Sequence, residues 1–233
     1  MLEIKWIYGD MHLGEHSMFN RIYKDTFSTM EAYHEGIIKR WNRKVTSNDD
    51  VILVLGDMGR AEAIADVIPK LRGRKWLILG NHDSYPKSFY EKYFEKVFTT
   101  PIFVRDRIVI SHHPIPVEDG VINIHGHTHH VKLKSKLHFN LCPEWWAYEP
   151  IQFKRFEGEL SKIPRPNRNF LYEWYADIQI PHTKDRNDLV LKKDGTIDVE
   201  ASRVLVAKLK AERELERVAM DAARKFLESN LDN

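Results

Sequence analysis

Cysteine, excess charge and long apolar runs are all scarce in this chain of 233 residues. A single cysteine, Cys142, excludes an intrachain disulfide and a metal site built from several thiolates, and it suits a reducing compartment. No apolar run has the length of a membrane span, and the opening MLEIKWIYGD has no signal-peptide pattern. We therefore expect a cytoplasmic protein without a membrane partner.

The charge balance also narrows the choice of function. Lys and Arg number 36 against 34 Asp and Glu, which gives a formal net charge of only +2. A dedicated nucleic-acid binder usually shows a strong basic excess, so nucleic acid is a possible but less favoured partner. Hydrophobic residues make up 42% of the chain, which indicates a globular protein with a real core.

Histidine is the residue that the chain has in unusual density. There are twelve, and six of them lie between positions 112 and 130. These six are His112, His113, His125, His127, His129 and His130. A packed core does not require such a concentration, whereas metal binding or proton transfer does.

Five short apolar runs rich in Ile and Val are each followed directly by a polar cluster. The runs are Ile4–Tyr8, Val51–Leu55, Trp76–Leu79, Ile108–Ile110 and Val121–Ile124. Runs of this kind predict buried strands. Ligands in α/β sheets bind beyond the carboxyl ends of the strands, so the five polar clusters are expected to form one site.

The spacing of apolar residues predicts helices in the first half of the chain. Thr29 to Lys44 has helical periodicity, and Ala61 to Leu71 and Ser84 to Tyr93 are weaker candidates. Further strands are expected at Ile102–Val104, Leu137–Leu141 and Pro150–Phe156, with no room for helices between the later ones. The first half therefore predicts βαβ units, and the second half predicts antiparallel pairing.

A polar, proline-containing segment from Ile163 to Asn169 suggests a boundary between a catalytic domain at 1–163 and an extension at 164–233. The extension contains an aromatic cluster at 170–175, a possible hairpin around Asp194 and Gly195, and a long charged helix candidate from Glu200 to Asn230. We expect it to be mostly helical and to supply no metal ligand. We expect the aromatic cluster to dock on the catalytic domain, and the charged helix to pack on that domain or on a second copy of the chain.

The residue types in the five clusters match the needs of phosphate-ester hydrolysis by two metal ions. Such a site needs a bridging carboxylate, neutral imidazoles and further oxygen donors. Asp10 and His12 stand at i and i+2, as do His127 and His129, and in an extended segment each pair would point to one side. Asp57 follows a strand alone, in the position for a bridging carboxylate.

Taken in order, Asp-x-His, Gly-Asp, Gly-Asn-His-Asp, His-His-Pro and Gly-His-x-His resemble the motif blocks of the calcineurin-like metallophosphoesterase family. The blocks span roughly residues 4 to 130, and the resemblance covers about two thirds of the chain. It implies an α+β fold, an αββα sandwich of two mixed sheets flanked by helices. It also implies a first metal held by Asp10, His12 and His129, a second held by Asn81, His112 and His127, and Asp57 bridging the two.

The resemblance further implies a reaction. A hydroxide that bridges the metals attacks phosphorus, His82 faces the leaving group as proton donor, and Asp83 orients His82. N and O ligands without thiolate suit Mn, Fe, Co, Ni or Zn. The expected function is a phosphoesterase that favours phosphodiesters, such as cyclic nucleotides or nucleotide-derived diesters. A phosphomonoesterase, a nuclease, and a scaffold without catalysis remain alternatives.

Several residues have a simpler structural explanation beside the functional one. Each Asp and Asn of the motifs, taken alone, could be a helix cap or turn residue. Arg60 could reach a phosphate or form a surface ion pair, and His113 could contact substrate or only be exposed. Trp145 and Trp146 could stack on a base, although packing near the last strand is the simpler explanation.

Overall fold

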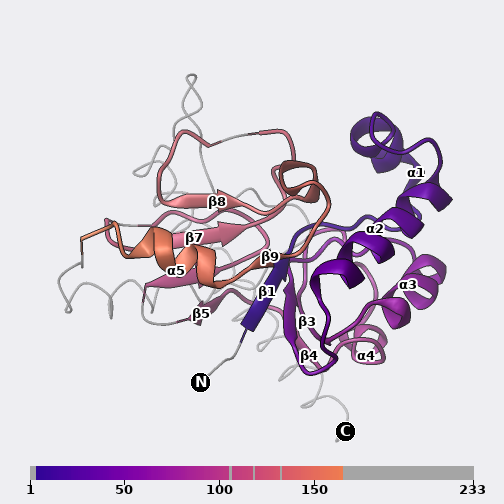
Figure 1. Cartoon of the computed structure of the whole chain (residues 1–233), viewed down its shortest axis with the longest axis horizontal. Helices are drawn as coiled ribbons and strands as arrows, with labels where there is room; N and C mark the ends of the chain where they lie inside the picture. Colours follow the sequence, from indigo (N-terminus) through magenta and orange to yellow (C-terminus); the bar gives the residue numbers. More distant parts are fainter. Residues whose placement is uncertain (1–3, 105–106, 118, 132, 165–233) are drawn as a thin grey trace, which may run out of the picture.

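Two stacked β-sheets flanked by helices form the structure, a computed structural model that describes residues 4–104, 107–117, 119–131 and 133–164 (Figure 1). The first sheet has the order β4-β3-β2-β1-β9 and the second the order β5-β6-β7-β8. This arrangement confirms the expected α+β sandwich of two mixed sheets. The domain boundary at 163 stays a prediction, and the aromatic cluster, hairpin and charged helix of the extension lie outside the described residues.

The strands of the first sheet are β1 (Ile4–Tyr8), β2 (Val51–Val54), β3 (Arg74–Ile78), β4 (Lys96–Phe98) and β9 (Ile151–Gln152). The first four pair in parallel, and β9 pairs antiparallel with β1. The expected βαβ units are therefore confirmed. Side chains alternate between the two faces: Trp6 and Tyr8 face the helices, and Ile7 faces the second sheet.

Helices cover the outer face of the first sheet (Figure 1). They are α1 (His16–Met18), the π-helical turn η1 (Phe19–Tyr23), α2 (Met30–Lys44), α3 (Ala61–Val67), the 3₁₀ turn η2 (Ile68–Lys70) and α4 (Lys87–Tyr90). At the start of α2, the Thr29 hydroxyl accepts a hydrogen bond from the Ala32 amide, which gives a partner to one of the backbone N–H groups of the first turn. Tyr33, Ile37 and Trp41 follow at helical spacing and are fully buried, so the predicted helix is confirmed.

The second sheet corrects the expected antiparallel second half. Its strands are β5 (Ile102–Val104), β6 (Ile108–Ile110), β7 (Ile122–His125) and β8 (His138–Asn140). Pairing of β5 with β6 is antiparallel, but β6–β7 and β7–β8 are parallel. A parallel connection needs about a dozen residues but no helix, and the loops 111–121 and 126–137 supply that length.

Three other expectations need correction. The segment from Phe153 onward is not strand: α5 (Lys154–Leu160) follows β9, and Phe153, Phe156 and Leu160 have the i, i+3, i+7 spacing of a helix. The helix expected at 84–93 is shortened, because α4 starts only after Pro86. Strand β4 and the turns α1 and η1 were not anticipated.

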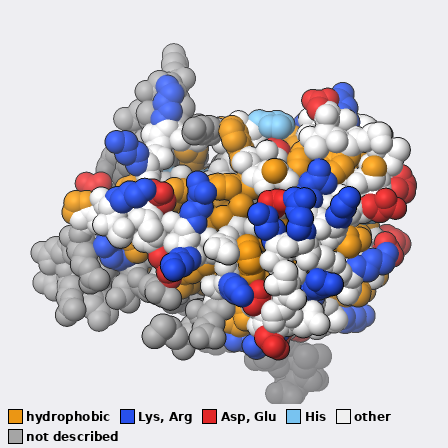
Figure 2. Space-filling model, in the orientation of Figure 1, with side chains coloured by type: hydrophobic (Ala, Val, Ile, Leu, Met, Phe, Trp, Pro, Cys, Tyr) orange, Lys and Arg blue, Asp and Glu red, His pale blue; other side chains and the backbone are white. Residues whose placement is uncertain are grey.

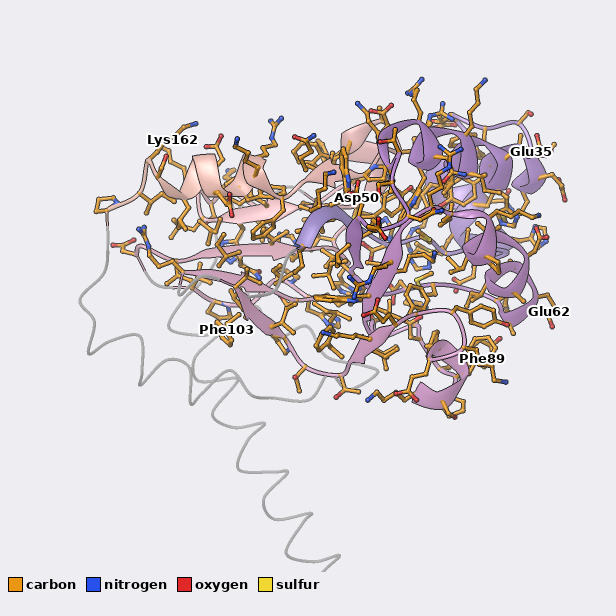
Figure 3. The ribbon with its side chains drawn as sticks, turned by 60° about the horizontal axis from the view of Figure 1, so that its bottom comes forward. Glu35, Asp50, Glu62, Phe89, Phe103 and Lys162 are labelled. Atoms are coloured by element: carbon orange, nitrogen blue, oxygen red, sulfur yellow. The ribbon has the colours of Figure 1, made fainter. Side chains whose placement is uncertain are left out.

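The core lies in two layers on either side of the first sheet. Between the sheets, Ile7 and Leu53 pack with residues of the second sheet such as Ile110 and Ile124. On the outer side of the second sheet, the 111–121 loop contributes Ile115 and Val121 to a smaller cluster. Figure 3 shows Glu35 of α2 and Glu62 of α3 at the helical side of the molecule, with Phe103 of β5 and Lys162 on the opposite side. No described helix is both long and apolar enough to cross a membrane.

Candidate active site

The loops that follow β1 and β2 are joined by backbone hydrogen bonds. The amides of Met11 and His12 both donate to the Asp57 carbonyl, and the Leu13 amide donates to the Met58 carbonyl. The buried hydroxyl of Tyr33, in α2, also donates a hydrogen bond to the Met11 carbonyl. The Asp-x-His and Gly-Asp motifs thus form one rigid unit at the carboxyl ends of neighbouring parallel strands.

Four of the predicted ligands have left-handed backbone conformations. The φ angles are 42° at His12, 51° at Asp57, 63° at His127 and 43° at His129. This corrects the expectation that Asp10 and His12, or His127 and His129, point to one side of an extended segment. Turning backbone brings the pairs together instead. Non-glycine residues at positive φ cost about 1–3 kcal/mol each and cluster at functional sites.

Two motif glycines allow carboxylates to approach the backbone. A Cβ on Gly126 would lie 2.2 Å from Asp10 Oδ2, and a Cβ on Gly80 would lie 2.2 Å from Asp57 Oδ1. Any side chain at these positions would push the carboxylate aside. The glycines of Gly-His-x-His and Gly-Asn-His-Asp are therefore needed for the geometry of the acidic residues.

Asp10, His12 and His129 form a first buried group of metal-ligand type. Their ligand atoms all lie within 4.8 Å of one another. The Nε2 atoms of His12 and His129 face each other at 3.2 Å. Two nitrogens bound to one ion at about 2.1 Å lie about 3.0–3.4 Å apart at octahedral or tetrahedral angles, so this spacing fits a shared metal.

Carboxylates at the opposite ring nitrogens favour the tautomer of these histidines that has its proton on Nδ1. His12 Nδ1 donates to Glu15 Oε2 at 3.2 Å, and His129 Nδ1 donates to Glu144 Oε1 at 3.0 Å. With Nδ1 protonated, each Nε2 carries a lone pair, and two lone pairs at 3.2 Å need a proton or a cation between them. Carboxylates behind metal-binding imidazoles are a common arrangement.

A second group surrounds His112. Its Nδ1 donates to the Leu55 carbonyl, and its Nε2 lies 2.9 Å from Asn81 Oδ1 and 3.4 Å from Asp57 Oδ2. The ring of His127 lies 5.2 Å from the His112 ring, centroid to centroid. Asn81 and His127 therefore both lie beside His112, and the assignment of these three residues to one metal ion stays a prediction.

Asp57 lies between the two groups. Its Oδ2 is 3.5 Å from His12 Nε2 and 3.4 Å from His112 Nε2, while its Oδ1 accepts the His82 amide at 2.9 Å. Burial alone would raise the Asp57 pKa, but the neighbouring His112 and His12 outweigh burial and hold the pKa well below its usual range. The carboxylate is thus ionised and placed between two sets of nitrogen ligands.

His82 is exposed at the edge of this cluster. Its ring lies 5.4 Å from the His12 ring in an edge-to-face arrangement. The Asp83 carboxylate accepts hydrogen bonds from the amides of Asp57, Met58 and Gly80, at 2.8–2.9 Å. Asp83 therefore joins the loops after β2 and β3, and its expected role in orienting the His82 ring stays a prediction. Burial, together with the Asp57 charge, raises the Asp83 pKa to about 6.

The two predicted substrate contacts lie in different settings. His113 is buried, and one of its ring nitrogens lies within 4.8 Å of ligand nitrogens of His112 and His127. Its ring centroid is 4.0 Å from that of His127. His113 thus adjoins the second group more closely than expected of a surface residue. Arg60 is exposed at the start of α3, and the described contacts do not join its side chain to the cluster.

The electrostatics fit a cation site. Burial lowers the His112 pKa, but the facing carboxylates of Asp57 and Asp10 outweigh it and raise the pKa to about 10. Burial likewise acts to raise the Asp10 pKa, and His112 and His129 lower it overall. Positive charge on protonated imidazoles thus offsets the negative charge of the buried carboxylates. Divalent ions can replace those protons, because metal ligands must be deprotonated and metal binding releases protons.

Three residues of the site were missed by sequence reasoning: Glu15, Glu144 and Cys142. Glu15 stands three residues after His12 in a turn, and this spacing was a usable signal. Cys142 donates its thiol proton to Asp10 Oδ2 at 3.2 Å, across 132 positions of sequence. No local pattern marks such a long-range contact.

The fold and the buried histidine–carboxylate groups define a metal-dependent hydrolase of phosphoric esters. The chain belongs to the calcineurin-like phosphoesterase family, whose model matches residues 6–196. Members of this family typically use two metal ions, and the His and Asp groups described above are the candidate sites for them.

Individual relatives are more distant. The Gene 66 protein of Mycobacterium phage L5 is 26% identical over 168 residues, which cover 56% of this chain and 80% of the phage protein. A protein of unknown function from Aquifex aeolicus has a crystal structure that matches at a TM-score of 0.52 and 20% identity, over 66% of this chain and 97% of that one. A nuclease from Pseudomonas putida matches at a TM-score of 0.36 and 20% identity, over 53% of this chain and 60% of the nuclease.

Proposed function

We propose that the chain is a two-metal phosphodiesterase. Asp10, His12 and His129 would hold the first ion, Asn81, His112 and His127 would hold the second, and Asp57 would contribute to both. The position of Asp57 Oδ2, 3.5 Å from His12 Nε2 and 3.4 Å from His112 Nε2, carries this assignment. A pair of divalent ions supplies Lewis acidity for the phosphoryl oxygens and lowers the pKa of water toward neutrality.

The protein's own groups complete the chemistry. His82 is exposed beside His12, and its backbone is fixed by the bond from its amide to Asp57 Oδ1. From there its imidazole protonates the leaving oxygen of the ester, which a positioned acid does most usefully for a poor leaving group. Asp83 holds the loop that carries His82 through its bonds to the Asp57, Met58 and Gly80 amides.

The rim of the site supports a nucleotide-derived diester as substrate. Trp145 is 45% exposed although its indole N–H donates to the His129 carbonyl, and Val131 is 52% exposed two positions beyond His129. An aromatic face held beside the first metal group offers a stacking surface for a base. Figure 2 shows Lys and Arg side chains scattered over one face of the molecule, with fewer Asp and Glu among them. The net charge of the chain is only +2, so a long nucleic acid is the less favoured substrate.

Metal dependence and ester class are tested together. Chelation should abolish hydrolysis of bis-p-nitrophenyl phosphate, and added Mn²⁺ should restore it, since oxygen and nitrogen ligands suit Mn²⁺, Fe, Co, Ni or Zn. We expect a higher kcat/KM for this diester than for p-nitrophenyl phosphate. Full activity after complete metal removal would refute the mechanism, and a clear preference for the monoester would assign the chain to phosphomonoesters.

A matched substrate pair tests the stacking surface. Trp145→Ala should raise KM for thymidine 5′-p-nitrophenyl phosphate about 5–150-fold more than for methyl p-nitrophenyl phosphate, from the roughly 1–3 kcal/mol of base stacking on an aromatic ring. Both substrates share the leaving group, so any general damage to the site affects them equally. Equal changes for the two would remove the base from the proposal. Trp145→Phe, which keeps an aromatic face, should restore most of the difference.

A further inference from the structure

His129 is held on three sides by one short segment, Cys142–Trp145, at the end of β8 and the start of the 3₁₀ turn η3 (Pro143–Trp146). The His129 amide donates to Cys142 Sγ at 3.2 Å. Its ring Nδ1 donates to Glu144 Oε1 at 3.0 Å, and its carbonyl accepts the Trp145 indole N–H. The backbone donor, the backbone acceptor and the ring of His129 each have a separate partner in this segment.

The same segment reaches a second residue of the first metal group. The Cys142 thiol donates to Asp10 Oδ2 at 3.2 Å, while Asp10 Oδ1 accepts the His127 amide at 2.9 Å. Cys142 and Asp10 are completely buried. One sulfur atom therefore accepts from His129 and donates to Asp10, and so fixes their relative positions.

The burial of Glu144 at this position is unfavourable for the stability of the fold. Its side chain is only 9% exposed, and its Oε2 has no hydrogen-bond partner among the described residues. A buried carboxylate with one satisfied oxygen destabilises a fold unless a positive charge compensates for it. Its partner, the His129 ring, is where a divalent cation would place that charge.

We infer that Cys142 and Glu144 are positioning residues that set the affinity of the first metal site independently of the second. This rests on the ligand assignment of the proposed function. The contacts of the segment described above go to His129 and Asp10, both assigned to the first ion, and they hold His129 at its left-handed φ of 43°. A carboxylate behind a metal-binding histidine also makes the imidazole a better ligand, and losing such a partner typically weakens metal binding 10–100-fold.

The test is metal retention by the full-length, Mn²⁺-loaded protein against graded concentrations of a chelator of known affinity, with Mn per chain measured by mass spectrometry. In Glu144→Gln we expect one of two Mn²⁺ to be lost at a free-metal concentration about 10–100-fold higher than in wild type, and the other to be unchanged. Glu144→Ala should show a larger shift of the same ion. Glu149→Gln is the matched control, because Glu149 pairs with Arg43 and Lys44 instead.

Cys142 supplies an independent arm. Cys142→Ala should weaken the same ion as Glu144→Gln, and Cys142→Ser, which keeps a donor and an acceptor, should restore much of the affinity. If wild type holds two Mn²⁺ and all these variants match it, or if both ions weaken equally, the inference is wrong while the two-metal site stands. If wild type itself holds fewer than two, the proposed function fails first.

Discussion

His138 is a half-buried histidine whose surroundings keep it neutral, so replacing it should change how the free energy of unfolding depends on pH. Its Nε2 donates to the Ile115 carbonyl at 2.8 Å, and its Nδ1 accepts the Ser135 hydroxyl at 2.9 Å. Both bonds suit the neutral ring. Burial lowers the His138 pKa to about 4, against about 6.5 in an unfolded chain.

The sign and size of the effect follow from this difference. The unfolded chain takes up the proton at a higher pH than the folded protein, so the stabilising contribution is fully present above about pH 6.5 and is lost as the pH falls toward 4. Between pH 7.5 and pH 5.0 this single group should lower the free energy of unfolding by about 2 kcal/mol.

The measurement is urea unfolding of wild type and His138→Gln at both pH values. Glutamine keeps a donor for the Ile115 carbonyl but does not titrate. We expect the variant to be less stable at pH 7.5, yet to lose about 2 kcal/mol less than wild type on acidification. His16→Gln, at an exposed position, is the control for removing a histidine.

Some acid dependence should remain in His138→Gln. His125 lies 6.1 Å from His138 between ring centroids, and burial with the charge of His138 lowers its pKa to about 3, so it destabilises the fold in acid in the same direction. The reasoning is refuted if wild type and His138→Gln lose the same free energy of unfolding between the two pH values.

Three further predictions concern the proposed site. His82→Ala should lower kcat about 10²–10⁴-fold for an alkyl diester and less for a p-nitrophenyl ester, with both metals retained by metal analysis; loss of a metal would instead make His82 a ligand. Gly126→Ala should displace Asp10 and lower the metal content, because the new Cβ would lie 2.2 Å from Asp10 Oδ2. The control is Gly158→Ala in α5, which should leave the metal content unchanged because no atom lies within 4 Å of the new Cβ. Deleting residues 166–233 should leave metal content unchanged as well, since every proposed ligand lies between positions 10 and 129; loss of metal would place part of the site in the extension.

The composition of the site could be predicted because motif order and strand order carry the same information. The polar residues after β1, β2 and β3 meet because the carboxyl ends of parallel strands share one edge of the sheet. Each apolar run predicts a strand, and the polar residues that follow the run predict a part of the site. This reasoning needs no knowledge of how the side chains point, so it brings these residues together without the extended-segment argument for Asp10 and His12, which was wrong.

The residues that support the ligands could not be found in the same way. Glu144 is an acidic residue in a turn, and nothing near it in sequence indicates that it bonds the ring of His129. Likewise Cys142 resembles any small buried residue until the contact with Asp10 is seen. Such contacts depend on tertiary packing, whereas motifs record only local spacing.

The errors in topology have a different cause. The apolar run after Pro150 contains the two-residue strand β9 and then a helical spacing of apolar residues from Phe153 to Leu160. Over so few residues, the periodicity of the strand cannot be separated from that of the helix. In the second sheet, the direction of β7 and β8 depends on whether a loop crosses over, and a loop without a helix gives no periodic signal. Periodicity defines an element but not the direction of its neighbour.

The features that make the site unfavourable without metal have a common explanation. Four proposed ligand residues have left-handed backbone, the Nε2 atoms of His12 and His129 face each other at 3.2 Å, and the Asp10 and Asp57 carboxylates lie within one buried cluster. Each of these destabilises the folded chain by itself, by about 1–3 kcal/mol for each strained residue. The cations that the family uses would offset the last two features directly and stabilise the turns that carry the ligands. The buried core around Ile7, Leu53 and Trp41 stabilises the fold enough to keep this strained arrangement formed. The site lowers the free energy of unfolding locally, and the two hydrophobic layers offset that loss.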